Sequence, residues 1–175
     1  MSQWVKVGVR GLQWLVYLPA NFLMLALAYA LAPVLAGYTT AIGVSVMPAW
    51  LSLFATPDNP LDGDAGHRAR WPDNSPWGAY KRRTAWLWRN PINGFTIGPL
   101  GAKGVLVPFV LGNPGITDNP YTPGWCLRLT IEGYWQIYYI SPSWHGIFAR
   151  LNFGWKLWGP KPSGQYVFSP VLRSQ

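Results

Sequence analysis

The stretch Leu12–Ala36 reads LQWLVYLPANFLMLALAYALAPVLA. It contains no charged residue, and its polar amides are Gln13 and Asn21. It lies inside a longer run without charge, Gly11–Pro57. About 20 apolar residues, at about 1.5 Å per residue, are enough for an α-helix to cross the hydrocarbon core of a bilayer. The stretch therefore predicts a long N-terminal helix that attaches the chain to a membrane.

The residues around and inside this stretch agree with a membrane helix. Basic residues precede it, and aromatic residues fall near its ends, as in the aromatic belts at membrane surfaces. Two prolines lie inside it, and membrane helices tolerate the kinks that prolines cause. The basic residues are Lys6 and Arg10, the aromatic residues are Trp4, Trp14, Tyr17 and Tyr38, and the prolines are Pro19 and Pro33.

Two alternative interpretations of the stretch stay open. A secretory signal peptide also has a charged start, but its apolar core spans only about 7–15 residues. A helix buried in the core of a soluble protein needs a larger surrounding domain than the ~120 residues that follow usually form. A signal peptide would be removed from the mature protein, whereas a core helix would be buried inside the folded domain.

The chain stays apolar after this stretch. Gly37–Thr40 predicts a break in the helix, and Pro48 splits the next apolar segment. Ala49–Phe54 then predicts a short interfacial helix, with a re-entrant span as the alternative. If the two segments form a hairpin, both termini share one side of the membrane, and the positive-inside rule makes that side cytoplasmic. The basic residues concerned are Lys6, Arg10, Arg68, Arg70, Lys81, Arg82 and Arg83.

The composition favours an apolar environment and an anionic partner. Only 11% of the residues are charged and 12 are tryptophan, whereas soluble domains carry roughly 25% charged residues. The net charge of +8 favours phospholipid head groups, nucleic acid or acidic glycans as partners, or serves as a solubilising surface. The one cysteine, Cys126, forms no internal disulfide and is expected in a strand as a small apolar residue.

An acidic loop follows the apolar segments. It contains Asp58, Asn59, Asp62 and Asp64, and four of the six acidic residues of the chain lie between Asp58 and Asp73. Oxygen ligands packed this closely can hold calcium or magnesium, although the spacing is not that of the standard calcium-binding loop. The alternative is a network of polar turns in which Asp side chains accept hydrogen bonds from backbone N–H groups.

A basic segment comes next. Tyr80–Asn90 predicts a helix that ends before a proline. Arg82 and Arg89 share one face of this helix, and Arg83 lies a step round. These arginines can pair with the acidic loop or lie on anionic head groups. No nucleic-acid-binding module matches the segment, so nucleic acid is not expected as a partner.

The C-terminal part predicts strands. Alternation with a period of two and a high content of β-formers indicate an antiparallel meander with one buried face, and Pro108 indicates an edge strand. The predicted strand segments are Val105–Val107 and Phe109–Leu111 on either side of Pro108, then Leu127–Glu132, Tyr134–Ile140, Ile147–Leu157 and Tyr166–Phe168. In the segment Leu127–Glu132, the residues Leu127, Leu129 and Ile131 form the apolar set.

Few other residues offer chemistry. Glu132, the single glutamate of the chain, can act as a general base or pair with Arg128 or Arg150 across the sheet. His67 and His145 are too few and too far apart in sequence for a metal site, and both are expected in loops. The full candidate cluster is Asp58, Asn59, Asp62, Asp64, Arg82, Arg83, Arg89, Asn90 and Glu132, with Asp58, Asp62 and Asp64 as the candidate ligands of calcium or magnesium.

The order of short motifs resembles small tailed-bacteriophage proteins that form a family of unknown function. The motifs are the apolar N-terminus, FATPDNPLDGD at Phe54–Asp64, WRNPINGF at Trp88–Phe95, EGYW at Glu132–Trp135, FGWKL at Phe153–Leu157 and VFSP at Val167–Pro170. The resemblance spans most of the chain and departs from the family at Ile137, where a more polar residue is expected. It implies a phage origin and supplies no reaction, so no catalytic role is carried over.

Together these observations predict an α+β protein. A membrane-associated helical segment, residues 1–55, precedes a tryptophan-rich basic domain, residues 56–175. The predicted function is that of a membrane-anchored phage accessory protein that binds at the host envelope or in the virion. The predicted location is the host inner membrane, with the domain in the cytoplasm, and the virion is the alternative location. The predicted partners are membrane lipids and a protein of the host envelope or the virion. The alternative is a cation-dependent enzyme that acts on a phosphate- or glycan-containing substrate through Asp58–Asp64.

Overall fold

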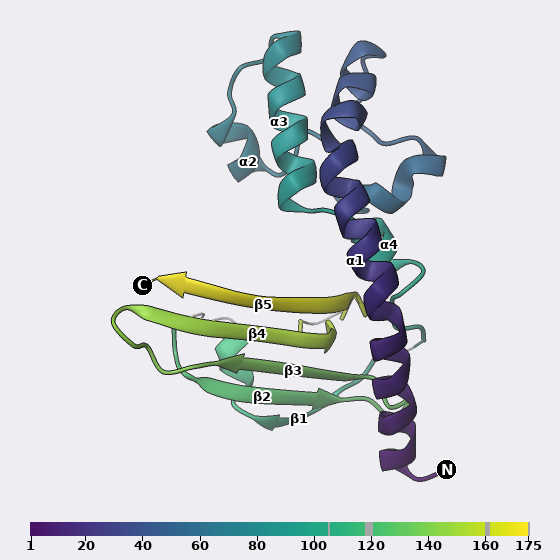
Figure 1. Ribbon diagram of the computed structural model, residues 1–175, viewed down its shortest axis with the longest axis vertical. Coiled ribbons are helices and arrows are strands. Elements are labelled where there is room, and N and C mark those ends of the chain that lie inside the picture. Colours follow the sequence, from purple (N-terminus) through teal and green to yellow (C-terminus); the bar gives the residue numbers. More distant parts are fainter. Residues whose placement is uncertain (105, 118–120, 160–161, 175) are drawn as a thin grey trace. The chain divides into compact units, whose positions relative to one another are not determined.

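The computed structural model describes residues 1–104, 106–117, 121–159 and 162–174. Figure 1 confirms the predicted α+β class, with a long N-terminal helix and a C-terminal antiparallel sheet. The elements in chain order are α1 (Gln3–Ala41), η1 (Ala49–Phe54), α2 (Ala65–Arg70), α3 (Pro76–Arg89), α4 (Asn93–Ile97), β1 (Phe109–Gly112), η2 (Pro114–Thr117), β2 (Gly124–Leu129), β3 (Trp135–Ile140), β4 (Ile147–Trp155) and β5 (Tyr166–Ser174), where η marks a 3₁₀ helix.

The chain divides into two compact units. The sheet unit consists of Met1–Tyr17 together with Leu100–Gln175, and the helical unit consists of Leu18–Pro99. Helix α1 therefore contributes its first part to the sheet unit and its remainder to the helical unit. Each unit has its own buried side chains.

Helix α1 is longer than the sequence predicted. The expected break at Gly37–Thr40 is wrong, because the helix continues to Ala41. The Thr39 hydroxyl donates to the backbone carbonyls of Leu35 (2.9 Å) and Ala36 (3.2 Å), so the polar side chain is satisfied inside the helix. In its most apolar window only 17% of the residues are buried. The helix is thus long and apolar enough to cross a membrane.

The core of the helical unit lies between one stripe of α1 and the segments that follow it. The predicted helix at Ala49–Phe54 is present as η1, and the predicted basic helix is present as α3, extended at its start to Pro76. Ser75 caps α3 by accepting a hydrogen bond from the Gly78 N–H. The buried core residues are Ala32, Leu35, Ala36, Met47, Leu51, Leu61 and Leu87.

The predicted meander is confirmed. The strands follow the order β1-β2-β3-β4-β5, and every neighbouring pair is antiparallel. Strand β1 lies at an edge directly after Pro108, as the proline indicated, while Val105 of the predicted strand lies outside the described residues. Cys126 lies in β2 and is fully buried, as expected.

Both faces of the sheet contain buried side chains, whereas the apolar alternation predicted one buried face. Arg128 and Thr130 are buried, whereas Ile131 beyond the end of β2 is 70% exposed and Ile137 in β3 is 44% exposed. Leu129 is buried as well. Among the described residues, Arg128 Nη2 donates to the Pro114 carbonyl (3.2 Å), whereas Arg128 Nη1 is buried without a hydrogen-bond partner.

A second buried polar contact joins two strands. The Gln136 amide in β3 donates to Asn152 Oδ1 in β4 (2.8 Å), and its oxygen accepts from the Leu157 N–H (3.0 Å). A buried amide with both ends bonded has little net cost. These bonds allow the sheet to turn polar side chains inward.

The first part of α1 packs on one end of the sheet. Trp14 is 8% exposed and lies within 5.4–6.0 Å, ring centre to ring centre, of Trp135, Phe153, Tyr166 and Phe168. Its indole N–H donates to the Val167 carbonyl (3.2 Å). This segment of α1 is therefore part of the core of the sheet unit.

Basic and amide side chains of α1 fasten it to the turn between β2 and β3. Gln3 donates to the Thr130 carbonyl (2.7 Å), Lys6 to the Ile131 carbonyl (3.1 Å) and Arg10 to the Glu132 carbonyl (3.4 Å). A Cβ on Gly133, whose φ is +85°, would lie 2.6 Å from the Lys6 carbonyl carbon. Glycine is required there because helix and turn approach so closely.

Candidate functional site

The acidic loop of the helical unit brings a carboxylate and two arginines together. Asp62 Oδ1 accepts from Arg82 Nη2 (2.9 Å) and Arg83 Nε (3.1 Å), and Asp62 Oδ2 accepts from Arg83 Nη2 (3.2 Å). Each arginine side chain is 9% exposed and that of Asp62 is 18% exposed. The pairing expected between the basic helix and the acidic loop is confirmed at Asp62.

These contacts keep the Asp62 carboxylate charged. Burial favours its neutral form, but the hydrogen bonds and positive charges of Arg83 and Arg82 outweigh burial, so the pKa of Asp62 lies below its ordinary value of 3.8. The ion pair is therefore intact at neutral pH and holds the acidic loop against α3.

Arg82 also organises the segment between α2 and α3. Its Nη1 donates to the backbone carbonyls of Trp71 (3.2 Å) and Asp73 (2.8 Å). Its own carbonyl lies 2.9 Å from His67 Nε2. The expectation of a loop position for His67 is wrong, because His67 is buried in α2, where this bond and the Trp86 ring at 5.0 Å enclose it.

Asp64 and Arg89 lie at the surface. Asp64 caps α2 by accepting a hydrogen bond from the His67 N–H (2.7 Å), the role that its position before a helix favours. Its second oxygen is 4.0 Å from Arg89 Nη1, and both side chains are about half exposed, so this ion pair contributes little. Asn90 ends α3 by donating from its side chain to the Trp86 carbonyl (3.3 Å).

The carboxylates of the loop do not converge. Among the described residues, no three His, Cys, Asp or Glu side chains lie close enough to share a metal ion. Asp62 is engaged by two arginines and Asp64 by a helix N-terminus. For these two residues the geometry favours the turn-and-pairing interpretation of the sequence.

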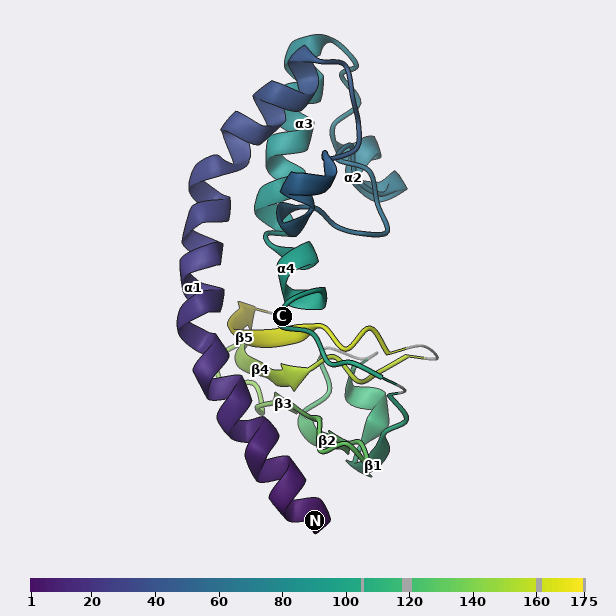
Figure 2. The same ribbon diagram turned by 90° about the vertical axis from the view of Figure 1, so that its right-hand side faces the viewer.

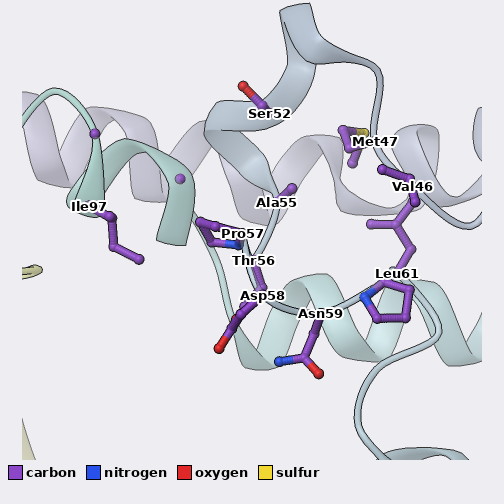
Figure 3. Close-up of a pocket in the computed structure, with 13 residues that line it drawn as sticks. Val46, Met47, Ser52, Ala55, Thr56, Pro57, Asp58, Asn59, Leu61 and Ile97 are labelled. Carbon is purple, nitrogen blue, oxygen red and sulfur yellow. The ribbon is translucent and has the colours of Figure 1, made fainter. Parts of the chain in front are cut away.

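Asp58 and Asn59 have a different setting, since both line a pocket of 580 Å³. Figure 3 shows them between Ile97 on one side and Val46 and Met47 on the other. The pocket walls are mostly apolar, while Asp58 supplies a carboxylate. Such a pocket suits a ligand group with an apolar body and a positive or hydrogen-bond-donating end.

Part of this pocket was not foreseen from the sequence. Its walls come from the segment before η1, from the acidic loop and from α4, which are far apart in the chain. Within α4, Gly94 approaches η1 so closely that a Cβ on it would lie 2.0 Å from the Ser52 carbonyl oxygen. The glycine of the WRNPINGF motif is the one signal that indicates this close packing.

Glu132 lies apart from these residues, in the sheet unit. The described part of the chain contains no ion pair between Glu132 and Arg128 or Arg150, so that expectation is wrong. Strand β2 ends at Leu129, which leaves Glu132 exposed in the following turn, where it lines a shallow pocket with Lys6 and Arg10. Arg128 instead points into the sheet unit.

Replacement of Gly63 by alanine is expected to destabilise the helical unit. Gly63 has a φ of +79°, and a Cβ on it would lie 2.7 Å from the rings of both His67 and Trp86. A side chain in this backbone region costs about 1–3 kcal/mol before any steric overlap. Thermal unfolding followed by circular dichroism measures the loss.

The matched control is Gly66→Ala in α2, three residues further on. Gly66 has an ordinary helical backbone, and the nearest atom to a Cβ is 3.5 Å away. Alanine there should stabilise by roughly 0.5–1 kcal/mol, because glycine is a poor helix former. Equal effects at the two positions would contradict the tight packing around Gly63.

Comparison with known proteins identifies a family for most of the chain. A model described as "Family of unknown function (DUF7338)" matches residues 6–171. No curated protein and no solved structure matches the chain. The match covers both units.

Proposed function

The chain belongs to this family of unknown function, and we propose that it is a membrane-attached accessory protein that acts by binding. The exposed side of α1 is the observation that carries the proposal. Apolar side chains cover this side along most of the helix, and water disfavours so much apolar surface. They include Trp4, Val5, Val9, Leu12, Leu15, Val16, Leu23, Leu27, Tyr29 and Val34.

We place the protein at the envelope of an infected bacterium or in a virion. The similarity of its motif order to phage proteins supports the phage origin, and the net charge of +8 supports contact with anionic head groups. The basic residues near α1 and in α3 support a cytoplasmic position at the inner membrane. The virion is the other location that the same motif order favours.

The pocket at Asp58 and Asn59 is our proposed contact point for a protein partner. A lysine or arginine side chain has an apolar stem and a cationic end, and the pocket offers apolar walls and one carboxylate. Asp62 and Asp64 have structural roles in this proposal, and Asp58 is the residue that meets the partner.

The membrane proposal is tested by charge on the exposed side of α1. Leu23, Leu27 and Val34 are 63%, 42% and 63% exposed, so lysine at these positions disrupts no packing. Each lysine costs about 2.5–3.5 kcal/mol at the centre of a membrane helix. The triple variant is expected to move from the carbonate-resistant membrane pellet to the soluble fraction when the full chain is expressed in bacteria.

The matched control adds the same charge elsewhere. Thr122, Ser143 and Ser163 are exposed outside α1, and lysine at all three should leave the chain in the membrane pellet. An unmodified chain that stays soluble as a monodisperse monomer would overturn the proposal. Removal of α1 is not a suitable test, because it also removes Trp14 from the core of the sheet unit.

A further inference from the structure

One face of the sheet carries no charge. Directly paired residues share a face, and pairing places Arg128 with Gln136, Arg150 with Ile140 and Arg173 with Phe148. These are the charged residues of the described strands, and all lie on the inner face. The opposite face, which we name the outward face, includes the exposed residues Phe109, Leu111, Trp125, Ile137, Ile147 and Leu172.

This arrangement differs from that in a water-soluble antiparallel sheet. In such a sheet, apolar residues pack on the core and polar residues face the solvent. In this sheet the inner face packs apolar residues such as Tyr138 and Ile140, while on the uncharged outward face Ile147 is 52% and Leu172 is 75% exposed. Contiguous exposed apolar surface of this kind marks a site of interaction with a partner or a membrane.

The outward face is continuous with the apolar surface of α1. Trp14 packs on the outward-face residues Trp135, Phe153 and Phe168, so the first part of α1 lies on this face. Figures 1 and 2 show this part of the helix crossing one end of the strands. In the same segment, Leu12 is 64% exposed. Helix and sheet therefore share one exposed apolar surface.

Two occupants suit an apolar face, namely a second copy of this chain and a lipid bilayer, and electrostatic charge distinguishes between them. A second copy of this chain carries the same net charge of +8, so association of two copies brings like charges together. A bilayer with anionic lipids has the opposite charge and an apolar interior. Trp125 is 53% exposed on this face, and tryptophan is enriched at the bilayer surface.

We propose that the outward face of the sheet lies on the bilayer, in the boundary between head groups and acyl chains, as a second membrane contact besides α1. This inference rests on the proposed membrane attachment and goes beyond it. It assigns the sheet to the membrane surface rather than to the surrounding water. The occupant is an anionic phospholipid bilayer.

Two adjacent residues of β1 provide the test. Leu111 is 45% exposed on the outward face, and Val110 is 40% exposed on the opposite face. Each is replaced by cysteine in the full chain and labelled with an environment-sensitive fluorophore. The native Cys126 is fully buried, and burial, partly opposed by Arg128, raises the pKa of its thiol, so it does not react. A Leu23→Cys variant reports on α1 in the same way.

The labelled proteins are reconstituted in vesicles of phosphatidylethanolamine and phosphatidylglycerol. At Leu111 a nitroxide attached to the acyl chains should quench most of the emission, and aqueous iodide should quench little. At Val110 iodide should quench and the lipid nitroxide should not. Circular dichroism confirms the fold of each variant, and Ile147→Cys, on the same face, replaces Leu111→Cys if the latter misfolds.

The outcomes separate this inference from the membrane proposal. Lipid quenching at Leu23 together with iodide quenching at Leu111 overturns the sheet contact and leaves the attachment of α1 intact. Iodide quenching at both positions overturns both proposals. Protection of Leu111 from both quenchers means that protein covers the face, as in a dimer, and also overturns the bilayer contact.

Discussion

Replacement of Asp62 by asparagine is expected to destabilise the helical unit by roughly 3 kcal/mol or more, because loss of one partner leaves buried charge uncompensated. Arg82 and Arg83 are each 7% exposed, and both bond this carboxylate. The Asp62 side chain is 18% exposed, which places the effect near the lower end of the range for buried pairs. Urea unfolding of the full chain in mild detergent, followed by circular dichroism, measures the change.

The same ion pair should make the helical unit sensitive to acid. The pKa of Asp62 in the folded protein is lower than its ordinary value of 3.8, so the folded state binds the proton more weakly than the unfolded state. The stabilisation is fully present above that ordinary value and is lost as the pH falls through the folded pKa. The Asp62→Asn variant lacks this group and should show a smaller loss of stability on acidification.

Asp58 supplies the control, since it comes from the same loop but lines the pocket. Asp58→Asn should change the free energy of unfolding by no more than ~0.5 kcal/mol, as expected for an exposed residue. Similar losses for the two variants would contradict the division of the loop into a structural carboxylate and a pocket carboxylate.

Replacement of Trp14 by alanine is expected to destabilise the sheet unit by about 3–5 kcal/mol, the usual cost of removing a large buried aromatic side chain. Four aromatic rings surround Trp14, and the Tyr166 hydroxyl donates to its backbone carbonyl (3.1 Å). The variant should also free the first part of α1 from the sheet. Hydrogen exchange over β3–β5 measures both effects.

Trp4 is the matched control in the same helix. It is 70% exposed, and Trp4→Ala should leave the exchange of the strands unchanged. A comparable loss in the two variants would mean that α1 packs on the sheet through a different set of contacts.

The sequence predicted the elements of the sheet better than its faces. The β-formers of Tyr134–Ile140 and the alternation after Ile147 locate strands, because strand formation follows local residue preferences. Which face is buried depends on distant partners. Arg128 turns inward because the Pro114 carbonyl accepts its hydrogen bond, and no local pattern reveals that contact.

The candidate site shows a similar division. The high local charge of the acidic loop made a pairing with the arginines of α3 predictable, and Asp62 confirms it. The pocket beside Asp58 was not predictable, because its walls come from three separated segments. The continuation of α1 through Gly37–Thr40 was missed as well, since Thr39 is satisfied by backbone carbonyls one turn earlier.

The split of the sheet unit along the chain bears on how the protein is synthesised. Leu18–Pro99 separates the first part of α1 from every strand. Chains fold from the N-terminus as they leave the ribosome, so α1 emerges while the aromatic partners of Trp14 are still untranslated. If α1 attaches to a membrane as we propose, the bilayer is the apolar phase open to the helix during that interval. The proposal then implies that membrane attachment comes before completion of the sheet.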